Sequence, residues 1–143
     1  MTAKEYLQRH LDADRAINAK LEQISRLRAL ATKTTQALQP DKVAGCTEDN
    51  MASIVAKIVD LSREVDEDID RLQKIKREVE EVINSVPNAK QREVLRWRYL
   101  VGCTWEQIAV NMDITYQWVC KLHGRALKKI SEKLIEVDTR SVV

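Results

Sequence analysis

The feature that most constrains the fold of this 143-residue chain is a series of apolar residues spaced three and four apart between residues 51 and 86. With one gap of seven, the series consists of Met51, Ile54, Ile58, Leu61, Val65, Leu72, Ile75, Val79, Val82 and Val86. This spacing predicts one long helix with coiled-coil packing over roughly five heptads, on the order of 50 Å long. Asp68 is the polar residue on this seam, and we expect the neighbouring Ile69 to compensate for it.

A second long helix is predicted before this one. Thr2 and Glu5 have the spacing of a capping box at a helix start. Apolar residues then follow at helical intervals, namely Tyr6, Ala13, Ile17, Leu21, Ile24, Leu27 and Ala31. The helix should end near Leu38, because Pro40 disfavours helical conformation in the residue before it. Residues 39–50 are then a loop, and the two helices form an antiparallel hairpin. The heptads leave open whether the hairpin also forms a homo-oligomer.

Composition and charge restrict the function. With three Gly and two Pro in the whole chain, long helices joined by few turns are expected, which is an all-α fold. Residues 1–86 contain 14 Lys or Arg and 16 Asp or Glu, whereas residues 87–143 contain 10 and 6, so their net charges are −2 and +4. The C-terminal part is therefore the candidate for binding nucleic acid.

The cellular location is predicted from what the sequence does not contain. The cysteines, Cys46, Cys103 and Cys120, are odd in number and irregularly spaced, so they indicate reduced thiols and no disulfide framework. The charged N-terminus does not have the form of a signal peptide, and no window is apolar enough for a membrane span. We expect a cytoplasmic protein without membrane contact.

The chain after Pro87 has the signals of three shorter helices. Their predicted N-terminal caps are Asn88 supported by Gln91, Thr104 supported by Gln107, and Thr115. Gly102 suits the end of the helix over residues 89–100, and Asp113 falls where the next turn needs a left-handed residue. The last helix should extend over residues 115–134 or to Val137. We therefore predict a helical hairpin over residues 1–86, a helix-turn-helix domain over 87–137 and a frayed tail over 138–143.

A family resemblance follows from several spaced motifs in this part. They are Arg92-Glu93-Val94-Leu95, Arg98-Tyr99, Thr104 with Glu106-Gln107-Ile108-Ala109, and Arg125-Ala126-Leu127-Lys128-Lys129-Ile130. Residues 91–130 resemble the C-terminal domain of bacterial sigma factors, which reads the −35 promoter element. The helical hairpin has no counterpart in that domain.

The whole chain is similar to small phage and prophage late-transcription regulators of the RinA and ArpU type. The stretches that carry this similarity are TAKEYL, KLEQISRLRALATKTT and IVAKIVDLSREVDEDID. The resemblance implies control of phage genes in the cytoplasm of a bacterial host.

The sigma resemblance implies that the recognition helix, residues 115–134, lies in the major groove of double-stranded DNA. The positions that match base-contacting residues are Tyr116, Gln117, Cys120 and Lys121. We expect phosphate contacts from Thr115, Arg125, Lys128 and Lys129, and Lys133 adds to the positive charge. Gln117 suits adenine, and Lys121 suits guanine or phosphate. Sigma domains usually have arginine at the positions of Tyr116 and Cys120, so a site other than the −35 sequence is expected.

Other functions are less well supported by the residues. Cys120 and His123 are three apart and Cys103 is nearby, but a structural zinc site needs a fourth ligand. A core cysteine and a surface or groove histidine are the simpler interpretation. No catalytic arrangement or cofactor motif is present, so we expect neither an enzyme nor a cofactor. A transcription regulator that also contacts RNA polymerase, a DNA-packaging protein like the small terminase subunit, and a polymerase-binding adaptor that does not bind DNA remain open.

Overall fold

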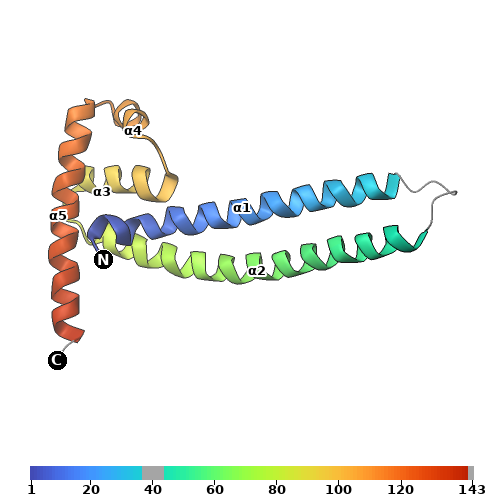
Figure 1. Ribbon diagram of the computed structural model, residues 1–143. Helices are drawn as coiled ribbons and strands as arrows, with labels where there is room; N and C mark the ends of the chain where they lie inside the picture. The colour runs from blue at the N-terminus through green and yellow to red at the C-terminus, as the bar shows by residue number, and fades with distance from the viewer. Residues whose placement is uncertain (37–43, 142–143) are drawn as a thin grey trace. The chain divides into compact units, whose positions relative to one another are not determined.

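The fold is all-α, as the sequence predicts. The computed structural model describes the backbone of residues 1–36 and 44–141 and the side chains of residues 1–33 and 49–136. Within these ranges the chain contains no strand. The elements (Figure 1) are α1 (Ala3–Gln36), α2 (Ala44–Asn84), α3 (Ala89–Leu95), the π-helix η1 (Arg96–Val101), α4 (Trp105–Met112) and α5 (Tyr116–Ser141). No helix of the described chain combines the length and the apolar character needed to cross a membrane.

Contacts divide the chain into two compact units. One unit contains residues 13–71, and the other contains residues 1–12 and 72–143. Both long helices therefore contribute to both units, α1 through its first residues and α2 through its last turns. The predicted division into a hairpin (residues 1–86), a helix-turn-helix domain (87–137) and a tail (138–143) is a division by function. It stays a prediction.

The unit of residues 13–71 is a pair of antiparallel helices. α1 and α2 lie side by side here (Figure 1), and the ammonium of Lys20 on α1 binds the carboxylates of Asp68 at 2.6 Å and Glu64 at 3.4 Å on α2. The hydrogen bond to Asp68 raises the pKa of Lys20 above its usual value. Asp68 thus has a partner across the hairpin. The expectation for Ile69 is wrong, because this side chain is 37% exposed.

The apolar contacts of this pair are sparse. Its buried apolar residues among the described side chains are Ile17, Ile24, Ile54 and Val65. Leu21, Val55 and Val59 are each more than 40% exposed. The antiparallel pairing agrees with the sequence, whereas coiled-coil packing of the seam stays a prediction.

The ends of the long helices differ from those predicted. α2 already begins at Ala44, so residues 44–50 are helical and the predicted loop is too long. Gly45 alone opposes helix strongly there, and extending an existing helix adds a hydrogen bond for each residue. The predicted end of the first helix at Leu38 lies outside the described residues. α5 continues to Ser141, because neither Gly nor Pro follows Leu134 to end it.

The second unit has a core built from both ends of the chain. Ala3 and Leu7 from α1 and the last turns of α2 pack against η1 and α5. The buried members of this core are Ala3, Leu7, Val79, Ile83, Val86, Leu95, Tyr99, Ala126 and Ile130. A salt bridge of 2.9 Å between Arg9 and Glu78 borders it. The C-terminal helices therefore pack on the base of the hairpin.

The predicted caps of this unit are largely confirmed. Thr2 and Glu5 form both bonds of a capping box at the start of α1, each 3.1 Å long. The Thr104 and Gln107 box at α4 is also complete. Asn88 accepts the backbone N–H of Gln91 at 3.0 Å, but the Gln91 side chain does not return the bond. It is 95% buried instead, and its Oε1 has no hydrogen-bond partner.

The helix predicted over residues 89–100 changes type along its length. Its second half is the π-helix η1, which ends at Val101 and is followed by the capping residue Gly102. The backbone N–H groups of Gly102 and Cys103 both donate to the carbonyl of Trp97, at 3.1 and 2.9 Å. Gly102 has φ 89°, a left-handed conformation that favours glycine, as predicted for this position.

Candidate nucleic-acid interface

The turn between α4 and α5 has the geometry expected from its residues. Asp113 is left-handed, with φ 54° and ψ 48°, and is the positive-φ residue other than glycine in the described chain. The N–H of Ile114 donates to the carbonyl of Ala109 at 3.0 Å, and the Ile114 side chain packs against the core. Thr115 then caps α5 by accepting the N–H of Trp118 at 3.1 Å. The turn holds α4 and α5 in a fixed orientation.

A second apolar cluster fixes the inner face of α5. Val94 of α3, Ile108 of α4, and Val119 and Leu122 of α5 are buried together. The partly buried residues packed around them are Trp97, Cys103, Trp105, Ala109, Met112 and Ile114. Trp97 and Trp105 thus border this apolar cluster. Residues 119, 122, 126 and 130 are buried in succession along α5, which leaves the opposite face of this helix in solvent.

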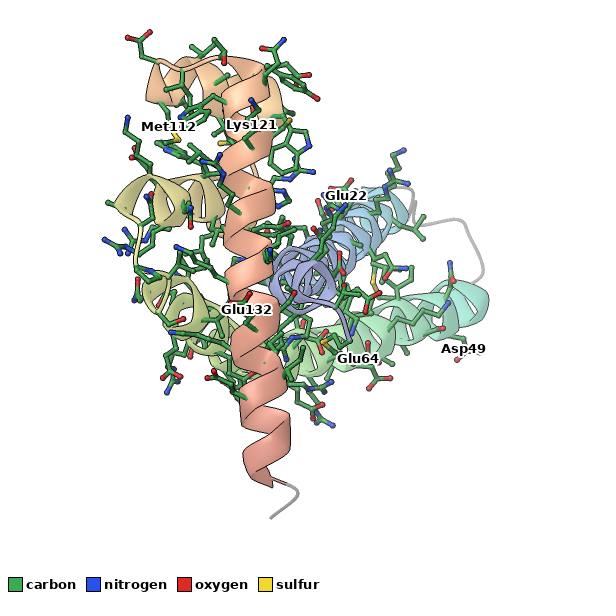
Figure 2. The ribbon with its side chains drawn as sticks, turned by 90° about the vertical axis from the view of Figure 1, so that its left-hand side faces the viewer. Glu22, Asp49, Glu64, Met112, Lys121 and Glu132 are labelled. Carbon is green, nitrogen blue, oxygen red and sulfur yellow. The ribbon has the colours of Figure 1, made fainter. Side chains whose placement is uncertain are left out.

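The four predicted base-contacting residues lie in the first turns of this outer face. Tyr116, Gln117, Cys120 and Lys121 are all exposed. Figure 2 shows Lys121 on the stretch of α5 near Met112 of α4, with Glu132 farther toward the C-terminus. The sulfur of Cys120, one helical turn away, raises the pKa of the Tyr116 phenol through electrostatic repulsion and a hydrogen bond. Amide, ammonium and phenol groups on one exposed helix face can donate to and accept from base edges.

The predicted phosphate-contacting residues are less uniform. Arg125 and Lys128 are exposed, whereas Lys129 is half-buried on the flank of the helix. The guanidinium carbon of Arg125 lies 5.4 Å from the centre of the Trp118 ring, an attractive cation–π arrangement. The Thr115 hydroxyl accepts a backbone N–H in its cap. Lys133 donates to the carbonyl of Ser85 at 2.8 Å, so it is held by the protein.

Three arginines before the turn stabilise the fold. Arg92 donates to the carbonyls of residues 86 and 87, and Arg96 donates to the Oδ1 of Asn84 at 2.6 Å. Arg98 donates to the carbonyl of Cys103 at 3.0 Å and lies 4.2 Å from the centre of the Trp105 ring.

A buried hydrogen-bonded network joins α1, η1 and the inner side of α5. Tyr99 is 0% exposed, and its hydroxyl lies 2.7 Å from Nε2 of His123. The Tyr99 carbonyl lies 3.1 Å from Nδ1 of His10, which must donate because a carbonyl can only accept. Burial raises the pKa of Tyr99 to about 12. Burial, with the charges of Lys4 and Arg98, lowers the pKa of His123 to about 4, so this imidazole is neutral at pH 7.

Sequence reasoning missed this network and predicted the wrong environment for His123 and for Cys120. His123 is packed 4.5 Å from the centre of the Trp105 ring, not at the surface. Cys120 is exposed, not in the core. The helical positions explain both results, since residue 123 lies closer to the buried stripe than residue 120 does. Among the described residues, no three histidine, cysteine or acidic side chains are placed to hold a metal ion.

Helices α3 to α5, with a tight left-handed turn before an exposed recognition helix, define a helix-turn-helix DNA-binding domain. Residues 88–132 match the family described as Sigma-70, region 4. The match covers 45 of the 143 residues and includes every base-contacting position predicted above. No match was found among curated proteins or among solved structures.

Proposed function

We propose that this protein is a sequence-specific transcriptional regulator of phage or prophage genes that places α5 in the major groove. The observation that carries the proposal is the exposed face of α5, where Gln117 and Lys121 follow a fixed turn and a buried stripe holds the opposite side. Lys121, Arg125 and Lys128 supply the positive charge for phosphates. Action in the cytoplasm of a bacterial host belongs to the same proposal.

Substitutions on α5 should separate specific from non-specific binding. Gln117→Ala is expected to cost about 1–3 kcal/mol at the preferred site and to relax the choice of one base. Lys128→Ala should weaken all duplexes about equally and lower the slope of log K against log salt by about one. The measurement is selection of duplexes from random DNA at low and high salt, followed by titration of the selected site.

The matched control for Lys128→Ala is Lys74→Ala, which removes the same charge from an exposed position on α2. It should leave the salt slope close to that of the parent protein. Unchanged base preference in Gln117→Ala would mean that α5 is not the recognition helix. Selection of no motif, with binding that disappears at high salt, would favour a DNA-packaging function.

Contact with RNA polymerase is the second part of the proposal. α4 presents Val110, which is 79% exposed, at a groove of about 420 Å³ lined also by Cys103, Glu106, Gln107 and Asn111. An exposed apolar residue at a groove suits a protein partner. Val110→Asp should then weaken binding of purified polymerase without changing DNA affinity. If polymerase binds while no duplex does, the protein is an adaptor.

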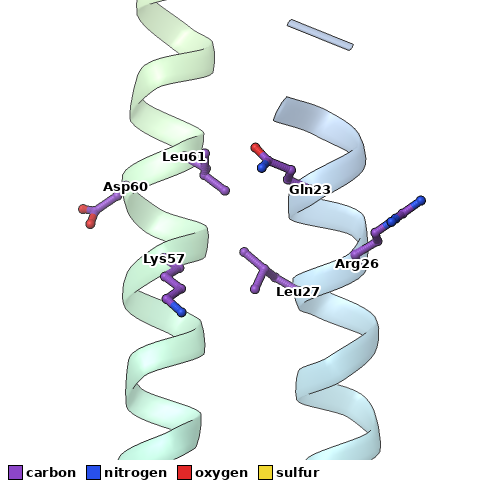
Figure 3. Close-up of a pocket in the computed structure, with 6 residues that line it drawn as sticks. All are labelled: Gln23, Arg26, Leu27, Lys57, Asp60 and Leu61. Atoms are coloured by element: carbon purple, nitrogen blue, oxygen red, sulfur yellow. The ribbon is translucent and has the colours of Figure 1, made fainter. Parts of the chain in front are cut away.

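We further propose that the hairpin forms a homo-oligomer. Two grooves between α1 and α2, of about 490 and 310 Å³, contain apolar residues. Figure 3 shows Leu27 and Leu61 pointing into the larger groove, whereas Arg26 and Asp60 point outward. Residues 13–36 hold five basic and two acidic residues, whereas residues 49–71 hold three and seven. A second copy related by a two-fold axis can place each basic helix against an acidic one, the arrangement that the charges favour.

Charge reversal tests this arrangement. Arg28 and Asp66 both line the smaller groove, one on each helix. Arg28→Glu and Asp66→Arg should each weaken self-association, and an equimolar mixture of the two should restore it through complementary pairs. Molar mass measured by light scattering over a range of concentrations gives the result. A parent protein that stays monomeric would contradict the proposal, and a large ring would favour the packaging function.

A further inference from the structure

The fold explains the glycine at residue 102 and leaves the glycine at residue 124 unexplained. Gly102 has φ 89°, and a Cβ added there would meet Leu11 at 3.4 Å. Gly124 lies inside α5 without a positive φ, and nothing within 4 Å would meet an added Cβ. Glycine is among the least favourable residues in a helix interior, because it loses the most backbone freedom on folding. The protein's own packing therefore provides no reason for Gly124.

Gly124 lies at a particular place on the outer face of α5. With 3.6 residues per turn, residues 117, 121, 124 and 128 follow one line along the helix. All four are exposed. The buried residues Val119, Leu122, Ala126 and Ile130 lie on the opposite side. Gly124 is thus at the centre of the proposed DNA-contacting face, between the base-contacting Gln117 and Lys121 and the phosphate-contacting Lys128.

We infer that Gly124 is the point where one sugar–phosphate strand of the DNA crosses α5 in close contact with the helix backbone. At about 1.5 Å per residue, the 26-residue α5 is on the order of 40 Å long, far longer than the major groove is wide. A helix whose first turns lie in the groove must therefore pass a groove edge farther along. A glycine at that point lets a strand approach the backbone, and the long side chains of Lys121, Arg125 and Lys128 surround it.

The inference rests on the proposed function and gives it a specific geometry. A side chain at residue 124 would hold the strand away from α5 and lengthen the neighbouring phosphate contacts. Close approach is a recurrent use of glycine where backbone meets a ligand. Glycine has no side chain that could bind the DNA. Gly124 then acts by letting the strand approach, which positions the DNA.

The test measures stability and DNA affinity in the same variants of the full chain. Gly124→Ala should raise the Tm by roughly 3–5 °C, because alanine favours helix. The same change should weaken binding of the selected duplex by about tenfold, and Gly124→Leu should weaken it further. The control Gly102→Ala should lower the Tm, because its φ is strained for alanine, and leave the affinity of the folded protein unchanged.

Lys128→Ala separates failure of this inference from failure of the proposed function. If Lys128→Ala weakens binding while Gly124→Ala binds as tightly as the parent protein, no strand crosses at Gly124. A lower Tm in Gly124→Ala would also overturn the inference, because it would reveal an internal reason for the glycine. If neither Lys128→Ala nor Gln117→Ala changes DNA binding, α5 is not the DNA-contacting helix and the proposed function itself fails.

Discussion

Replacing Tyr99 by alanine is expected to lower the free energy of unfolding by about 3–5 kcal/mol, as for other large buried side chains. Tyr99 is 0% exposed and packs among apolar residues from α1, α2 and α5. All three tryptophans of the chain lie between residues 97 and 118. Their fluorescence during urea unfolding therefore reports on this unit and not on residues 13–71.

Tyr99→Phe is the matched control for this prediction. It keeps the ring and removes the hydroxyl that lies 2.7 Å from His123. The loss should be about 1 kcal/mol, the usual contribution of one hydrogen bond. Equal losses in Tyr99→Phe and Tyr99→Ala would contradict the prediction, because they would show that the hydroxyl matters and the packing of the ring does not.

Acid is expected to destabilise the same unit through His123. The unfolded chain protonates this imidazole near pH 6.5, whereas the folded protein holds it neutral until about pH 4. The unfolded state therefore binds more protons between these values, and the free energy of unfolding falls as pH decreases from about 6.5 to 4. We expect a loss of about 2 kcal/mol, after allowing for the part of the ring that water reaches. Urea unfolding at several pH values measures it.

His123→Gln isolates this effect from the titration of the carboxylates. Glutamine keeps a polar group near the Tyr99 hydroxyl but cannot gain a proton. The difference in stability between the variant and the parent should therefore depend on pH below about 6.5 and be constant above it. A difference that stays constant from pH 7 to pH 4 would show that the folded protein accepts the proton on His123 without cost.

The parts of the fold that the sequence predicts correctly depend on local signals. The caps at Thr2, Asn88, Thr104 and Thr115 each need an oxygen and a backbone N–H a few residues apart, so their residue types suffice. Gly102 was predicted in the same way, because glycine tolerates a left-handed backbone.

The parts that were missed depend on residues far apart in the chain. His10 has no recognisable sequence context, and its acceptor lies 89 residues later. The pairing of Lys20 with Asp68 across the hairpin likewise cannot be found from either helix alone. Local propensity likewise does not distinguish the π-helix of residues 96–101 from a continued α-helix. The sequence patterns did indicate which face of α5 is exposed, because that depends only on helical period.

The core shared by both ends of the chain determines when this unit can fold during synthesis. Ala3 and Leu7 leave the ribosome early, but they pack against Tyr99, Ala126 and Ile130. At a synthesis rate of about 5–20 residues per second, the acceptor of His10, 89 residues later, is made roughly 4–18 s after His10 itself. Until residue 79 is synthesised, Ala3 and Leu7 have none of the buried long-range partners of this core. They therefore stay accessible to chaperones and proteases until residues 79–130 have been synthesised.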